Sequence, residues 1–273
     1  MQAAPRRRAH RSSGPSLTPQ PAASSWQAAK SASRESNEPV DWRNGEGRSM
    51  LEVVPYFAVP FGFAKLENCD ALNGQLRELF LRRAAEGSVY ANPNPLTQRN
   101  RRVFESEFQV FRWPDRCVQQ LKEFCWHQMM QMIGQLNGYD SAALGRMLIT
   151  SDSWFHITRR GGFFALHNHP NASWSGVYCV DPGKRDPDKQ ESGLLSFVNP
   201  SVTSAMYMDA ANLNLRGAFA YHIRHLQLEP GQLVLFPSWI LHDVKPFEGD
   251  GERITVAFNC WFAFQDAAAP ASV

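Results

Sequence analysis

The chain has 273 residues, which corresponds to one or two domains. Hydrophobic residues make up 43% of it, aromatic residues 12%, and the formal net charge is +2. This composition excludes a chain that is disordered throughout and argues against a basic nucleic-acid-binding protein. The sequence contains no apolar run of the ~18–20 residues that a membrane helix needs. Its five cysteines are scattered without a CxxC motif, which excludes a disulfide scaffold or zinc ribbon and indicates a reducing compartment.

The charge is distributed unevenly along the chain. Residues 1–34 carry six basic residues and no acidic one, whereas residues 35–273 carry 22 basic and 26 acidic residues. The leader is rich in Ala, Ser, Pro and Gly, so it cannot bury enough apolar surface to offset its ordering entropy. We predict a disordered basic tail over 1–48, one folded domain over 49–266 and a flexible tail over 267–273. An organelle transit peptide is the alternative for the leader, so the predicted location is cytoplasmic or organellar.

The first part of the folded domain is predicted to contain two helices. Residues 51–63, dense in Val, Phe and Tyr with two prolines, indicate an edge strand or an extended segment. The first helix follows, with Asn68 or Asp70 as its cap, and a loop over 90–102 separates it from a second helix that ends at Asn137-Gly138. The apolar positions with helical spacing are Leu72, Leu76, Leu79 and Phe80 in the first helix and Val118, Leu121, Cys125, Met129, Met132, Ile133 and Leu136 in the second.

The pattern changes after Gly145. Short segments rich in β-branched and aromatic residues alternate with Gly, Pro and Asp, and no helical period lies between them. The seven predicted strands are Met147–Ile157, Phe163–His169, Ser173–Asp181, Leu194–Val198, Ala218–Leu228, Gln232–Phe236 and Arg253–Phe262. This succession favours a β-sandwich or barrel. We therefore expect a mainly β fold with two helices packed on an antiparallel jelly roll.

Two histidines in one predicted strand form the first candidate site. His167 and His169 are separated by one residue, and residues i and i+2 of a strand point to the same face. Two imidazoles placed in this way can share a metal ion such as zinc, copper, iron or nickel. An HxH motif alone is a weak signal, because an ordinary exposed pair has the same spacing.

A distant histidine and a strand arginine complete the pattern. A predicted strand runs into a turn that ends at His242, and Arg253 opens the last predicted strand eleven residues later. If Arg253 points inward it needs an anion, because an unpaired buried charge is too costly, and a carboxylate suits its two-pronged guanidinium. Thr255 lies two residues further on the same face and could add a hydroxyl. The alternative is that Arg253 faces solvent.

These residues resemble the 2-oxoglutarate- and Fe(II)-dependent oxygenases. More closely, they resemble the branch of putative 2OG-Fe(II) oxygenases with the motifs His-x-His-Pro-Asn, Ser-Gly-Val-Tyr and Phe-Pro-Ser-Trp, followed by a His and an Arg. The corresponding segments here are His167–Asn171, Ser175–Tyr178, Phe236–Trp239, His242 and Arg253. The resemblance covers roughly residues 50–264 and implies a double-stranded β-helix, also called a jelly-roll or cupin-like fold.

The resemblance also implies roles for individual residues. His167 and His242 match the two histidine ligands of iron, and His169 stands where the wider superfamily has Asp or Glu. Either the site holds three histidines, which we favour, or a carboxylate such as Asp243 or Asp181 completes it. Arg253 matches the residue that pairs with the distal carboxylate of 2-oxoglutarate, Thr255 is a plausible helper and Ser175 matches a small polar residue that lines the cosubstrate pocket. His156, where this branch would have Asn, is either a pocket residue or an ordinary strand histidine.

The function implied is that of a dioxygenase that uses Fe(II), 2-oxoglutarate and O₂ to hydroxylate a substrate, releasing succinate and CO₂. Two rivals remain from the residues alone: a non-catalytic jelly roll that binds a metal or ligand, and a three-histidine cupin-type dioxygenase that needs no 2-oxoglutarate. The substrate is a small molecule or a protein that the sequence does not identify. We expect neither a nucleic acid nor a membrane as partner, and a homodimer stays an open alternative for the oligomeric state.

Overall fold

The structure of the protein is a computed structural model that describes residues 53, 55, 57–203 and 207–265. The tails predicted over 1–48 and 267–273 lie outside the described residues. The described helices are α2 (Asp70–Ala85), α3 (Arg116–Asn137) and α4 (Ser141–Gly145), and none of them is long and apolar enough to cross a membrane. The strands are β1 (Gly62–Lys65), β2 (Val103–Glu105), β3 (Met147–Thr158), β4 (Phe164–His167), β5 (Trp174–Asp181), β6 (Lys184–Arg185), β7 (Leu195–Phe197), β8 (Arg224–Leu226), β9 (Gln232–Pro237), β10 (His242–Val244), β11 (Gly249–Asp250) and β12 (Arg253–Phe264).

Two antiparallel sheets form the body of the domain. The larger sheet has the order β1-β9-β5-β12-β3-β2, the smaller one β4-β10-β7-β8, and β6 pairs with β11. Eight of these strands form the central part of the two sheets, with four strands in each sheet, and the chain passes between the sheets several times. In chain order they are β3, β4, β5, β7, β8, β9, β10 and β12. The first, third, sixth and eighth of them belong to the larger sheet, which is the arrangement of a double-stranded β-helix. The predicted fold class is confirmed.

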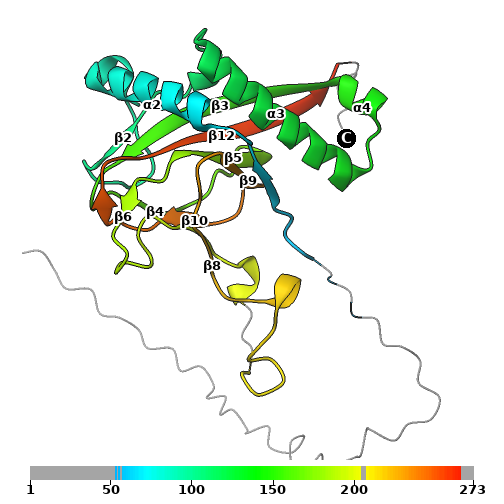
Figure 1. The fold of residues 1–273 in the computed structure, drawn as a ribbon. Helices are drawn as coiled ribbons and strands as arrows, with labels where there is room; N and C mark the ends of the chain where they lie inside the picture. Colours follow the sequence, from blue (N-terminus) through cyan, green and yellow to red (C-terminus); the bar gives the residue numbers. More distant parts are fainter. Residues whose placement is uncertain (1–52, 54, 56, 204–206, 266–273) are drawn as a thin grey trace, which may run out of the picture. The chain divides into compact units, whose positions relative to one another are not determined.

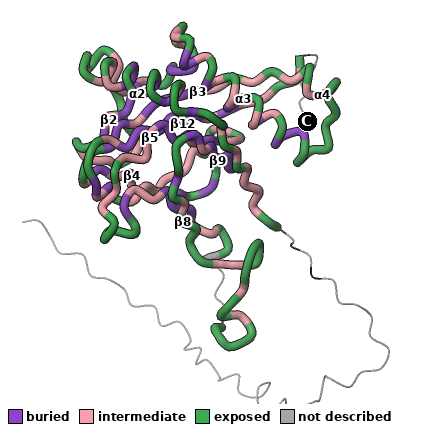
Figure 2. Tube along the Cα trace, viewed as in Figure 1, coloured by how far each residue is buried: buried purple, intermediate pink, exposed green. Residues whose placement is uncertain are grey.

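The two long helices cover the outer face of the larger sheet (Figure 1). Alternate residues of β12, among them Ile254, Val256 and Phe258, are fully buried there and belong to one apolar core with residues of α2 and α3. Figure 2 shows this buried layer running along β12 and β5 beneath the helices. The other residues of β12 face the opposite way, toward the smaller sheet, and this inner face is where the candidate site lies.

The helices follow the predicted apolar pattern, with two differences at single residues. α3 starts after Asp115 and ends at Gly138, whose φ of 67° is the left-handed conformation expected of a terminating glycine. The predicted cap of α2 is wrong, because Cys69 occupies the N-cap position and Asp70 is already the first helical residue. Leu136, predicted on the apolar stripe of the second helix, is 47% exposed, since the last turn of α3 extends beyond the core.

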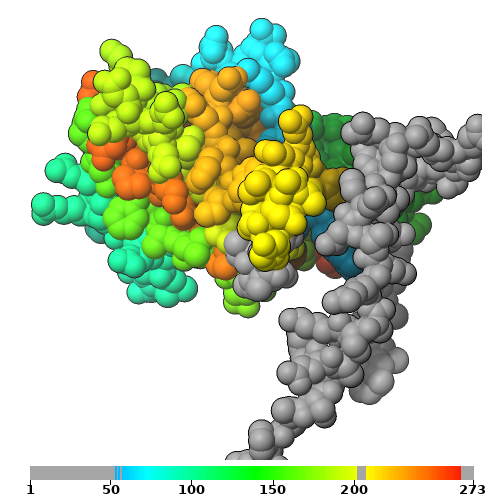
Figure 3. All heavy atoms as spheres, turned by 90° about the horizontal axis from the view of Figure 1, so that it is seen from below, coloured from blue at the N-terminus to red at the C-terminus, as the bar shows by residue number. Residues whose placement is uncertain are grey.

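Several strand boundaries differ from the prediction. The strand predicted within 51–63 starts only at Gly62, where β1 begins to pair with β9. The strand predicted over 163–169 ends at His167, and the one predicted over 218–228 is reduced to Arg224–Leu226. Residues 207–223, between β7 and β8, instead form a surface segment, drawn in yellow in Figure 3. A turn and a short 3₁₀ helix in this segment take its apolar residues out of the sheet.

The glycine of the Ser-Gly-Val-Tyr motif is required by packing. A Cβ atom on Gly176 would overlap the ring of Phe258 and lie 2.9 Å from Cδ2 of Leu235. We expect Gly176→Ala to lower the free energy of unfolding by about 1–3 kcal/mol, because this part of the core cannot expand without strain. Gly74→Ala is the matched control. A Cβ at this position in α2 meets nothing within 4 Å, and the change should raise stability by about 0.5–1 kcal/mol in denaturant unfolding. Equal effects of the two substitutions would contradict the packing argument.

Candidate metal and cosubstrate site

A cavity of about 320 Å³ lies between the inner faces of the two sheets. The larger sheet contributes alternate residues of β3 and further residues of β5, β9 and β12, and the smaller sheet contributes residues of β4, β7 and β10. The loop that was predicted over 90–102 closes one side through Leu96 and Thr97. The six residues that the resemblance assigned to the metal and the cosubstrate all line this cavity: His167, His169, His242, Arg253, Thr255 and Ser175.

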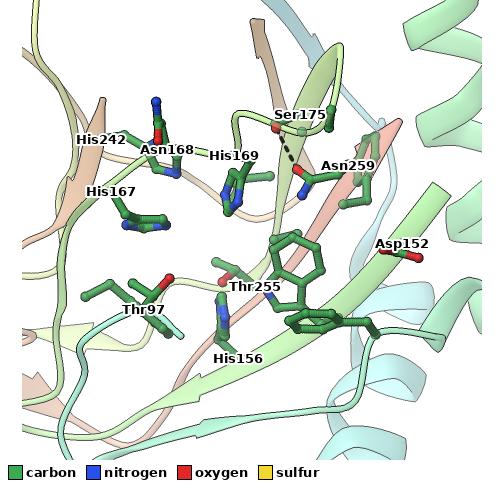
Figure 4. Close-up of a pocket in the computed structure, with 18 of the residues that line it drawn as sticks. Thr97, Asp152, His156, His167, Asn168, His169, Ser175, His242, Thr255 and Asn259 are labelled. Carbon is green, nitrogen blue, oxygen red and sulfur yellow. Dashed lines mark hydrogen bonds between the residues drawn. The ribbon is translucent and has the colours of Figure 1, made fainter. Parts of the chain in front are cut away.

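Three histidines from distant parts of the chain meet in the cavity (Figure 4). His167 and His242 are register partners on β4 and β10, and His169 lies just beyond the end of β4. Potential ligand nitrogens of the three side chains all lie within 4.8 Å of one another. The described residues thus bring together the three imidazoles that were predicted as metal ligands, and this donor set suits iron and other first-row transition metals.

Backbone carbonyls fix the orientation of two of the imidazoles. Nδ1 of His167 lies 2.7 Å from the carbonyl oxygen of Ala165, and Nδ1 of His242 lies 3.0 Å from that of Ile240. Because a carbonyl only accepts, each Nδ1 carries the hydrogen and each Nε2 keeps a free lone pair. Burial lowers the pKa of all three histidines, to about 4 for His169 and about 3 for His242. The imidazoles are therefore neutral near pH 7, which is the form that binds a metal.

His169 reaches the cluster by a route that the strand argument did not include. Because β4 ends at His167, strand alternation does not orient His169. Its backbone N–H instead donates to the carbonyl oxygen of Ser238 at 2.8 Å, and Nδ2 of Asn168 donates to the carbonyl oxygen of Trp239 at 3.1 Å. These bonds join the His-x-His motif to the Phe-Pro-Ser-Trp motif. Hydrogen bonds between two loops thus place His169.

The carboxylates considered as alternative ligands lie elsewhere. Oδ2 of Asp243 is 3.1 Å from Nζ of Lys245, and Asp181 accepts hydrogen bonds from Arg77 and from the backbone N–H of Gly183. Within the described part of the chain, no Asp or Glu belongs to the group of potential ligands around the three histidines. The geometry therefore favours a three-histidine site, and that assignment stays a prediction.

Arg253 points into the cavity and is buried, with 5% of its surface exposed. Among the described residues, no carboxylate lies within ion-pair distance of its guanidinium group, and burial lowers its pKa. Gly193 allows this placement, since a Cβ there would come within 3.2 Å of Cδ of Arg253. A buried cation without an intramolecular counter-charge is costly, so this group is suited to bind an anion that enters the cavity.

Thr255, predicted as a helper of Arg253, and Ser175, predicted to line the cosubstrate pocket, differ in the hydrogen bonds that they can donate to a ligand. Thr255 lies two residues along β12 from Arg253, buried in the cavity wall, and its hydroxyl has no hydrogen-bond partner among the described residues. Oγ of Ser175, by contrast, donates to Oδ1 of Asn259 at 2.7 Å (Figure 4) and shares a second bond of 2.7 Å with Oγ of Ser238. Thr255 is therefore free to contact a cosubstrate, whereas Ser175 would have to give up a bond to donate one.

Sequence reasoning missed a buried polar pair beside this site. Oε2 of Glu105 lies 3.2 Å from Nε2 of His156, and Oε1 accepts from Nδ2 of Asn92 at 2.6 Å and lies 3.8 Å from Nε of Arg99. Burial alone would raise the pKa of the Glu105 carboxyl group. The contacts with His156, Asn92 and Arg99 have the larger combined effect, so this pKa is lowered. Glu105 thus ties the loop that carries Thr97 to the cavity wall. His156 is the pocket residue that the sequence had left open.

Comparison with known proteins relates part of the chain to one family. Residues 152–259 match the model of a family described as "Putative 2OG-Fe(II) oxygenase", whereas no curated protein matches the chain. Among solved structures, a Pseudomonas putida prolyl-4-hydroxylase is 15% identical, with a TM-score of 0.47, over 74% of this chain and 92% of the other. AviO1 from Streptomyces viridochromogenes Tue57 is 15% identical, with a TM-score of 0.48, over 77% and 93%. HygX from Streptomyces hygroscopicus, solved with nickel, 2-oxoglutarate and hygromycin B, is 12% identical, with a TM-score of 0.43, over 74% and 83%.

The fold and the family match point to the same class of protein, the 2-oxoglutarate-dependent non-haem iron oxygenases. The histidine cluster and Arg253 both fall within residues 152–259, the part that matches the family model. Residues 152–259 thus resemble the 2OG-Fe(II) oxygenases, and the family resemblance stated from the sequence is confirmed. Fe(II), 2-oxoglutarate and O₂ are the cofactor and cosubstrates of this family.

Proposed function

We propose that the chain hydroxylates an organic substrate in an Fe(II)- and 2-oxoglutarate-dependent reaction, with His167, His169 and His242 as the metal ligands. The observation that carries this proposal is Arg253, a buried guanidinium group without a carboxylate partner among the described residues, in the same cavity as the three imidazoles. A plain metal-binding jelly roll has no use for such a cation. A dicarboxylate that reaches from the metal to Arg253 would supply the missing counter-charge.

The chain's own residues hold and orient the reactants. When bound, Fe(II) with 2-oxoglutarate and O₂ supplies the oxidation, in which 2-oxoglutarate yields succinate and CO₂ and one oxygen atom enters a C–H bond of the substrate. The three neutral imidazoles would hold the metal, while Arg253 and the hydroxyl of Thr255 would hold the distal carboxylate. Phe236 and Phe197 pack against His242, with ring centroids 5.1 and 5.8 Å away, and exclude water from that side.

Spectroscopy of the anaerobic complex tests this function. Addition of Fe(II) and 2-oxoglutarate to the full chain is expected to give a weak visible charge-transfer band, and admission of O₂ should release succinate. The non-enzymatic jelly roll predicts neither signal. A three-histidine dioxygenase without a cosubstrate predicts iron binding with no band and no succinate. Absence of both signals in iron-loaded protein would therefore contradict the proposed function.

A further inference from the structure

The proposed function leaves one end of the cavity without a role. On β3 and β12, Arg253 pairs with Thr158, whereas Asn259, six residues further along β12, pairs with Asp152. At about 3.3 Å per residue, the two pairs are about 20 Å apart. Figure 4 shows the side chain of Asp152 on the far side of the aromatic residues from His167. The cavity thus has a cation at one end and a carboxylate at the other.

The charge of Asp152 has no counterpart in the described residues. No ion pair or side-chain hydrogen bond joins it to another of them, and Arg253 is the only Lys or Arg that lines the cavity. The other carboxylate in the lining, Glu105, is already held by His156, Asn92 and Arg99. Aspartate is depleted in strands, so its place inside the twelve-residue β3 is notable. An incoming cation would supply the missing partner.

Aromatic side chains surround this end. The rings of Trp154 and Phe108 lie 4.8 Å apart, centroid to centroid. Trp261 also lines the cavity, two residues along β12 from Asn259, the register partner of Asp152, and its Nε1 donates to the carbonyl oxygen of Asn171. The negative faces of aromatic rings attract cations, and tryptophan does so most strongly. A carboxylate flanked by aromatic rings is suited to an ammonium or guanidinium group rather than to an anionic or purely apolar one.

We propose that Asp152, with Trp154, Phe108 and Trp261, binds a positively charged nitrogen group of the primary substrate. This inference deepens the proposed function and rests on it for the position of the oxidised carbon. The ring of Trp154 lies 5.7 Å from that of His169, and Asp152 is two residues, or about 7 Å, further along β3. The oxidised carbon is therefore several bonds away from the charged nitrogen.

Binding of small cations tests the proposal directly. The full chain, loaded with Zn(II) and 2-oxoglutarate, is titrated with n-butylammonium, n-butylguanidinium, butan-1-ol and butanoate, and binding is followed by saturation-transfer difference NMR. We expect the two cations to bind at least about tenfold more tightly than the alcohol, and butanoate to bind no better than the alcohol. Equal affinities for n-butylammonium and butan-1-ol would overturn the proposal.

Variants separate the charge of Asp152 from its shape. Asp152→Asn should bring the affinities for n-butylammonium and butan-1-ol within about twofold of each other, whereas Asp152→Glu should keep the preference for the cation. Asp188→Asn, the same change at an exposed position outside the cavity lining, should have no effect. An unchanged cation preference in a folded Asp152→Asn variant, checked by circular dichroism, would also overturn the proposal.

Two further arms make the outcomes distinguishable. The titration is repeated with metal-free protein, where the cation preference should persist, because the aspartate and the aromatic rings need no metal. Cation binding without any succinate release would count against the proposed function alone, and succinate release without a cation preference would count against this inference alone.

A comparison of N-acetyl-lysine methylamide with n-butylammonium distinguishes a protein side chain from a small metabolite as the source of the cationic group. Tighter binding of the peptide indicates a protein side chain, and tighter binding of the free amine indicates a small metabolite.

Discussion

His242→Ala is expected to abolish metal binding and to lower 2-oxoglutarate turnover by more than about 100-fold. Loss of a residue that merely supports a ligand costs 10–100-fold in comparable sites, so loss of a ligand should cost more. His242 is suited to this role because the carbonyl of Ile240 holds its Nδ1–H, and because its ring offers a ligand atom to the group that it forms with His167 and His169. The measurements are metal content after dialysis against Fe(II) and succinate release under saturating 2-oxoglutarate.

Two controls separate ligand loss from loss of structure. His242 is buried, so the alanine variant leaves a cavity and is accompanied by His242→Gln, which fills most of the space without supplying an imidazole. His222→Ala changes an exposed histidine on the surface segment and should leave metal content and turnover unchanged. Full turnover in a folded His242→Ala or His242→Gln variant would show that the ligand assignment is wrong.

For the part of the site on the long strand β12, the sequence showed which residues share a face but not what that face contacts. Arg253 and Thr255 alternate with Ile254 and Val256 at the start of β12, so the two pairs point to opposite faces of the sheet. The prediction could not decide between the inner face and solvent, because both faces of this strand are covered. Only the second sheet, packed opposite, makes the inner face a cavity wall.

The residues that sequence reasoning missed depend on contacts between distant short segments. β2 has three residues and follows an Arg- and Asn-rich loop, so no alternation marks Glu105 as buried, and its pairing with His156 exists only because β2 joins the edge of β3. β10 is equally short, which is why His242 was placed after a turn instead of within a strand. Asp152 gave no signal, since an aspartate in an alternating segment is ordinarily a solvent-facing residue.

Arg253→Met is expected to remove the stabilisation that 2-oxoglutarate gives the protein while leaving the metal-binding histidines intact. At a ligand concentration of 100 times Kd, a ligand that binds only the folded state adds about 2.7 kcal/mol to the free energy of unfolding. Loss of a buried, charged pair typically costs 2–5 kcal/mol of binding. If Kd rises about 100-fold, the same concentration adds only about 0.4 kcal/mol. The measurement is the thermal unfolding of Zn(II)-loaded protein with and without 2-oxoglutarate.

The same variant tests whether the guanidinium is uncompensated in the ligand-free protein. Because no carboxylate among the described residues pairs with Arg253, replacing it by an apolar side chain of similar length should not lower the stability of the ligand-free form and can raise it. Arg253→Lys keeps the charge but loses the two-pronged geometry, so its response to 2-oxoglutarate should be intermediate. 2-Oxobutyrate lacks the distal carboxylate and should stabilise the wild-type protein and Arg253→Met equally. A full response of Arg253→Met to 2-oxoglutarate would instead place the carboxylate contact on another residue.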